Sequence, residues 1–119
     1  MGYLAGARDD VVTFLEAAMP TLQVWPSPRF PDTLLADCLV VAPTSVTPAS
    51  VAYAAVTAQL DLFVLSATTA GDAAEDHLEA LLDSVLVVLD ANQVTWTRAE
   101  RSTFQELYPA YKIEMEIPR

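Results

Sequence analysis

The chain has 119 residues, 53% of them apolar, and carries a formal net charge of −10. This length and composition are typical of one globular domain over residues 1–119, and the composition excludes the disordered and fibrous classes. A membrane-spanning class is excluded because no apolar run reaches the roughly 20 residues that a spanning helix needs. The negative charge disfavours binding to nucleic acid or to anionic membranes, since both kinds of binding need clustered cations.

The chain begins with a predicted helix over residues 9–19. An aspartate at its start can accept hydrogen bonds from the free amides of the first turn, and the apolar residues follow a helical stripe. Pro20 ends the helix, because the residue before a proline is pushed out of the helical conformation. A short strand over residues 22–25 follows, and then a proline-rich connector over residues 26–32 that cannot be an interior strand.

Two further strands are predicted, separated by an exposed connection. The first strand covers residues 34–42, and the connection covers residues 43–48, which contain two prolines. The second strand covers residues 51–67, where the alternation predicts one buried face and one partly polar face. Its buried face consists of Ala58, Leu60, Leu62 and Val64.

The second helix has the clearest pattern in the sequence. Asp72 is a good N-cap, and Glu75 stands three residues later, as in a capping box. Leucines and valines then recur at helical spacing as far as about Asp90, and Asn92 favours the end of the helix.

Two strands follow this helix. Residues 94–104 are rich in threonine and aromatic residues, residues 110–117 alternate between apolar and charged ones, and Pro109 is predicted at the turn between them. The order of elements predicts an α+β fold, with a largely antiparallel sheet of four to five strands and two helices packed on one face.

The residues that could carry catalysis have simpler interpretations. His77, the one histidine of the chain, is interpreted as a solvated helix residue. Cys38, the one cysteine, cannot form an internal disulfide, and it lies in an apolar strand without the nearby cations that activate a thiol. Phosphate-binding glycine loops, nucleophile elbows and zinc-binding spacings do not occur in the sequence. We therefore predict no enzyme activity, no metal and no cofactor, and synthesis in a reducing, intracellular environment.

Charge is distributed unevenly along the chain. No lysine or arginine occurs between Arg29 and Arg98, whereas the C-terminal part is balanced. The acidic side chains of the second helix favour a solvated surface or a protein contact over loose binding of a divalent cation. A second copy could offer its cations to these acids. The residues of this predicted subunit contact are Asp72, Asp76, Glu79, Asp83, Arg98, Arg101 and Lys112.

Three acidic residues are predicted on strands. Asp61 interrupts an apolar run, and Glu114 and Glu116 alternate with apolar residues on the last strand. Each is read as an outward-facing residue or as one side of a salt bridge between subunits. If Asp61, Glu114 and Glu116 share a face, the sheet presents an acidic wall on the side away from the helices.

Several C-terminal segments resemble the tail terminator proteins of long-tailed, non-contractile bacteriophages. They are the helix over residues 76–89, the stretch VTWTRA from Val94, the stretch STF from Ser102 and the stretch YPAYKI from Tyr108. The N-terminal order of helix, proline-rich connector and strand is similar too, so the resemblance covers nearly the full chain.

The resemblance implies a structural virion protein that is made in the host cytoplasm and is located at the tail–head junction. Such proteins form a ring, typically of six copies, that caps the tail tube, ends its polymerisation and offers the joining surface to the head connector. DNA passes through the lumen without specific binding, and the partners are further copies, the major tail tube protein and the connector protein. The resemblance brings no catalytic residue with it.

Two alternatives stay open at the level of sequence. One is a neck or head–tail completion protein, which shares the size, acidity and virion role of a terminator. The other is a small enzyme that holds a metal on the acidic helix. A stable ring favours the virion roles, whereas a monomer with a deep polar pocket favours the enzyme.

Overall fold

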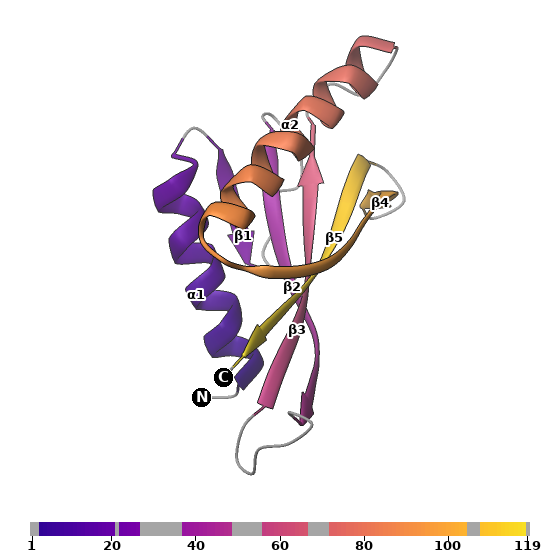
Figure 1. Cartoon of the computed structure of the whole chain (residues 1–119). Coiled ribbons are helices and arrows are strands. Elements are labelled where there is room, and N and C mark those ends of the chain that lie inside the picture. The colour runs from indigo at the N-terminus through magenta and orange to yellow at the C-terminus, as the bar shows by residue number, and fades with distance from the viewer. Residues whose placement is uncertain are drawn as a thin grey trace.

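The structure is a computed structural model, and it describes residues 3–20, 22–26, 37–48, 56–66, 72–104 and 108–118. Its elements are α1 (Tyr3–Ala18), β1 (Gln23–Pro26), β2 (Cys38–Pro48), β3 (Val56–Leu65), α2 (Asp72–Ala91), β4 (Thr95–Phe104) and β5 (Tyr108–Pro118). The strands form one five-stranded sheet in the order β1-β2-β3-β5-β4 (Figure 1). β1 runs parallel to β2, and the other neighbouring strands are antiparallel. The predicted α+β class with a largely antiparallel sheet is confirmed.

The main core contains side chains from both helices and from three central strands. Along β3 its members are the predicted alternate positions, and α2 contributes residues at helical spacing while it crosses the strands obliquely (Figure 1). Side chains alternate across a strand, so the residues between these positions belong to the other face of the sheet. The buried members are Ala7, Val11, Leu15, Leu39, Val41, Ala58, Leu60, Leu62, Val64, Leu78, Leu82, Val85, Leu89, Ile113 and Met115.

Two proline-containing segments predicted as connections are strands in the structure. The prediction for residues 43–48 is wrong, because this segment continues β2 and pairs with β3. β1 ends at Pro26 opposite Val41, so among the described strands β2 pairs with β3 alone beyond that point and tolerates the missing amide protons of its prolines. The prediction that Pro109 lies at a turn is also wrong, because Pro109 is part of a strand. It lies inside β5, one residue before the pairing with β3 begins.

Helix α1 begins earlier than the sequence predicts. It starts at Tyr3, and the aspartates that were expected to cap it lie inside it. Ala7 is fully buried and continues the core stripe towards the N-terminus, so tertiary packing overrides the local capping signal. The remaining sequence predictions for residues 27–32, 34–36, 51–55 and 67 fall outside the described residues.

Helix α2 ends in a Schellman cap. Gln93 has a φ of 58°. The backbone amide of Val94 donates to the carbonyl of Leu89 over 2.9 Å, and that of Gln93 donates to the carbonyl of Asp90 over 3.1 Å. This pair of bonds satisfies carbonyls that the last helical turn leaves free. The cap therefore fixes the direction in which the chain leaves α2 for β4.

Replacing Gln93 with glycine is expected to raise the free energy of unfolding by about 0.5–1 kcal/mol, since glycine adopts the left-handed conformation without a Cβ clash. The matched control is Ala91→Gly in the last helical turn, which should cost about 1 kcal/mol. Urea denaturation of both variants checks the difference. Destabilisation by Gln93→Gly would contradict the cap.

Candidate functional site

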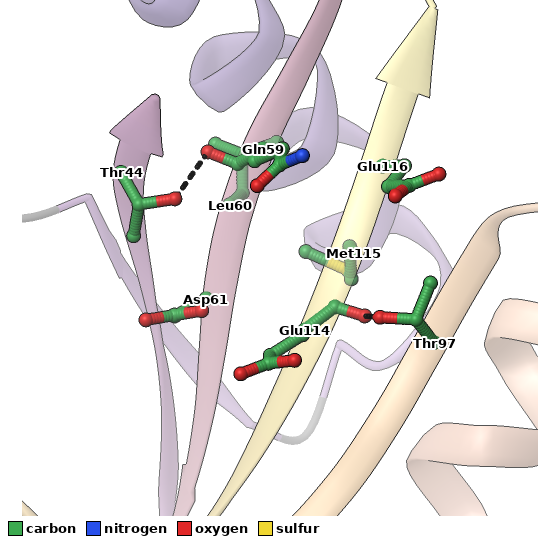
Figure 2. Close-up of a pocket in the computed structure, with 8 residues that line it drawn as sticks. All are labelled: Thr44, Gln59, Leu60, Asp61, Thr97, Glu114, Met115 and Glu116. Atoms are coloured by element: carbon green, nitrogen blue, oxygen red, sulfur yellow. Dashed lines mark hydrogen bonds between the residues drawn. The ribbon is translucent and has the colours of Figure 1, made fainter. Parts of the chain in front are cut away.

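Three acidic residues gather on the sheet face opposite the main core. Asp61 of β3 stands opposite Glu114 of β5, and Gln59 stands opposite Glu116. These positions alternate with core positions of the same strands and therefore point to the other face. Figure 2 shows their side chains around one pocket. The structure thus brings together Asp61, Glu114 and Glu116, and we call this surface the acidic face.

The pocket on the acidic face has a volume of about 270 Å³ and lies between two strand irregularities. The register of β2 against β3 shifts around Thr44, and that of β4 against β5 shifts around Thr97. The hydroxyl of Thr44 donates to the carbonyl of Gln59 over 2.9 Å, and that of Thr97 donates to the carbonyl of Glu114 over 3.5 Å. Such irregularities re-aim side chains. The pocket lining, which we call the acidic hollow, consists of Thr44, Gln59, Leu60, Asp61, Thr97, Glu114, Met115 and Glu116.

The electrostatics of the acidic hollow are unfavourable to a carboxylate. Burial raises the pKa of Asp61, Lys112 opposes this shift, and the neighbouring charges of Glu114 and Glu100 add to it. The Lys112 Nζ atom lies 3.3 Å from Glu100 Oε1 and 3.9 Å from Glu114 Oε1. Lys112 is therefore shared among several acids, and the hollow keeps an excess of negative charge.

The variant Asp61→Asn is expected to be more stable than the parent protein at neutral pH. The folded-state pKa of Asp61 lies above its unfolded value, so the folded protein binds the proton more tightly and ionisation costs stability as pH rises through the folded pKa. Removal of the like charge opposite Glu114 should raise the free energy of unfolding by about 0.2–1 kcal/mol at about pH 7. The gain should shrink at about pH 4. A variant less stable than the parent at neutral pH would refute this account.

The cations of the predicted subunit contact have acidic partners in the same chain. Arg98 Nη2 lies 2.6 Å from Glu100 Oε2, and Lys112 also contacts Glu100. Arg101 binds Glu75 of α2 with two hydrogen bonds, from Nη2 over 2.6 Å and from Nε over 3.2 Å. An ion pair between subunits at these cations would compete with the bonds within the chain.

The pair of Arg101 and Glu75 attaches the first turns of α2 to the β4–β5 end of the sheet. Arg101 Nη1 donates in addition to the carbonyls of Ser102 and Ala110, over 2.6 Å and 3.2 Å. The hydrogen bond from Arg101 lowers the pKa of Glu75, and the same bond raises the pKa of Arg101. The bidentate geometry holds both groups charged.

The acidic side chains of α2 are solvated in the structure. Asp76, Glu79 and Asp83 are exposed, and the side chain of Asp72, the first residue of α2, lies outside the description. Within the described ranges, no group of three or more His, Cys, Asp or Glu residues could hold a metal ion. The structure therefore does not join the α2 acids to the acidic hollow.

His77 has a partner that the sequence pattern did not indicate. Its Nε2 atom lies 2.5 Å from Asp37 Oδ2, and the His77 side chain is 48% exposed. The prediction of an exposed helix residue is confirmed, but the ring also links the first half of α2 to the start of β2. The two residues are 40 positions apart in sequence, so local spacing carries no signal for this contact.

A second, smaller apolar cluster lies on the same sheet face as the acidic hollow. Cys38, Val40, Leu65 and Ala110 are fully buried in it. Burial raises the pKa of Cys38 to about 12, and the charge of Asp37 acts in the same direction. The prediction that Cys38 is buried is therefore confirmed.

The thiol of Cys38 is expected to be inert in the folded protein. A pKa near 12 instead of 9.0 lowers the thiolate fraction about a thousandfold, and the thiolate is the reactive form. Reaction with an aromatic disulfide reagent at about pH 8 should be at least about a thousandfold slower in buffer than in denaturant. Rapid labelling of the native chain would contradict the burial.

Within the described residues, no helix is long and apolar enough to cross a membrane. Comparison with protein-family models and with curated proteins finds no match.

Proposed function

We propose that the chain is a structural virion protein, a tail terminator that caps the tube of a long-tailed, non-contractile phage. Several copies form a ring, end the polymerisation of the tube and offer the joining surface to the head connector. DNA passes through the lumen of the ring. The observation that carries the proposal is the acidic face, where Asp61 stands opposite Glu114 and Glu116 lies beside them.

An acidic surface suits a conduit for DNA. A protein binds DNA by neutralising phosphates with lysine and arginine, and each such contact holds the DNA in place. Carboxylates in the place of these lysines and arginines repel phosphate and leave the duplex free to slide. Screening limits this repulsion to about 8 Å at physiological ionic strength, so the acids have to line the lumen directly. In the proposed ring, the acidic face of each copy lines the lumen.

Two of the segments that carry the resemblance lie at this face. The stretch from Val94 leads into β4 and the stretch from Tyr108 begins β5, whereas residues 76–89 lie in α2, which packs on the opposite face of the sheet. β5 contributes Glu114 and Glu116, and β4 contributes Thr97 to the rim of the hollow. The resemblance and the geometry therefore support the proposal through the same part of the chain.

Electron microscopy with the cognate major tail tube protein tests this role. Preformed tubes mixed with the chain should carry a ring at one end, and native mass spectrometry of the capped particles should give the copy number. Because such a protein can stay monomeric until it meets the tube, the assay includes the tube. Binding to the head connector but not to tubes would favour the neck protein instead, and binding to neither would contradict both.

A further inference from the structure

Strand β4 forms the longer of the two edges of the described sheet. It is ten residues long, whereas β1 at the opposite edge has four residues and ends in a proline. Among the described strands, β5 is the one neighbour of β4. An edge strand presents a row of backbone N–H and C=O groups that can pair with another strand. β4 is therefore the part of the sheet best suited to strand pairing.

Two rows of charged side chains run across β5 and β4 and end at this edge. Glu100 of β4 stands opposite Lys112, and Arg98 stands opposite Glu114. Arg98 and Glu100 are two residues apart, so they share a face. One row therefore ends in a negative charge and the next row in a positive charge.

We propose that β4 pairs in antiparallel fashion with β4 of a second copy, about a two-fold axis at Ala99. In this register Arg98 of each copy lies opposite Glu100 of the other, and the contact occurs twice by symmetry. Charges then alternate along each row that crosses the contact between the two β4 strands. Lys112 and Glu100 of one copy are followed by Arg98 and Glu114 of the second copy. The two contacts between copies replace the Arg98–Glu100 contact within each copy, and opposite charges that face each other across strands stabilise the pairing.

The same charges select one register. A shift of the axis by one residue towards the N-terminus places Arg98 opposite itself, and the equal shift towards the C-terminus places Glu100 opposite itself. Like charges directly opposite each other are destabilising. A second copy in the Ala99 register is therefore the occupant that the edge fits best. In a two-fold pair of this kind the same surface of both copies meets, and the assembly stops at two copies. The pair therefore does not depend on the proposed ring, in which two different surfaces meet.

The test uses two single charge reversals, Arg98→Glu and Glu100→Arg. Each variant alone places like charges across the contact between the two β4 strands, so its self-association should weaken about tenfold or more. An equimolar mixture should associate again, because each copy then offers the charge that the other lacks. Sedimentation velocity over a concentration series measures this, and circular dichroism checks the fold. Glu16→Arg on the exposed side of α1 is the matched control and should leave association unchanged.

A cross-link gives a second test that does not depend on charge. The two-fold axis places Ala99 opposite itself, with Cα atoms roughly 4.5–5.5 Å apart, a distance that a disulfide can span. Ala99→Cys should therefore form a covalent dimer on mild oxidation, since Cys38 is buried, whereas Thr103→Cys should not. A parent protein that stays monomeric at its highest soluble concentration, or a mixture of reversals that fails to associate, would overturn the inference. Both of these results would leave the proposed capping of tail tubes untouched, since that role is tested separately with the tubes themselves.

Discussion

Replacing Leu62 with alanine is expected to lower the free energy of unfolding by about 2–5 kcal/mol, which is the range for removal of a buried leucine side chain. Leu62 is fully buried. It stands in the middle of β3 between Val41 of β2 and Ile113 of β5. Neighbours on both sides are held by strand pairing, so they cannot move into the cavity. Because domains are stable by about 5–15 kcal/mol, such a loss is a large part of the total.

Val87→Ala is the matched control for this change. Val87 lies on α2 and its side chain is 68% exposed, so its truncation should change stability by no more than about 0.5 kcal/mol. Urea denaturation of both variants gives the two free energies at similar m-values. Equal losses in the two variants would show that the main core does not lie where the structure places it.

Reversing the charge of the acidic face is expected to convert the proposed ring into a DNA-binding protein. The triple variant Asp61→Lys, Glu114→Lys and Glu116→Lys moves the formal charge of each copy from −10 by six positive units. Lysines around the lumen would neutralise phosphates, so assembled rings should retain duplex DNA at low salt. Their affinity should fall about a thousandfold or more between roughly 50 and 200 mM salt, as counterions compete. Filter binding of assembled rings measures this, and rings of the parent protein should not retain DNA.

A second triple variant with the same change in net charge serves as the control. Asp9→Lys, Asp10→Lys and Glu16→Lys place the new cations on the exposed side of α1. If the acidic face lines the lumen, DNA retention should depend on the strand positions much more than on the helix positions. Equal retention by the two variants would contradict the placement of the acidic face.

The acidic face could be predicted in part from the sequence because its residues follow a local rule. Asp61 and Glu114 each stand between apolar residues on a strand, and the alternation of side chains along a strand assigns them to the face away from the core. That they stand opposite each other depends on β3 and β5 being neighbours. This pairing joins residues about 50 positions apart, and periodicity does not report which strands are adjacent.

The predictions that failed did so where tertiary position overrides a local signal. Proline normally argues against a strand, but residues 43–48 and Pro109 lie where a strand has one paired neighbour among the described strands. The contact between His77 and Asp37 and that between Arg101 and Glu75 likewise form because the fold brings distant elements together. The strand irregularity at Thr44 directly follows Pro43, a residue type that occurs at bulges and edges, whereas the one at Thr97 has no distinctive residue type to indicate it.

The length of tail tubes tests the proposed function most directly. Major tail tube protein from the same phage is allowed to polymerise with and without this chain, and tube lengths are measured by electron microscopy. The proposal predicts that tubes stop growing once the chain is added and carry a ring at one end, whereas tubes without it continue to elongate. Identical length distributions and bare tube ends in both samples would contradict it.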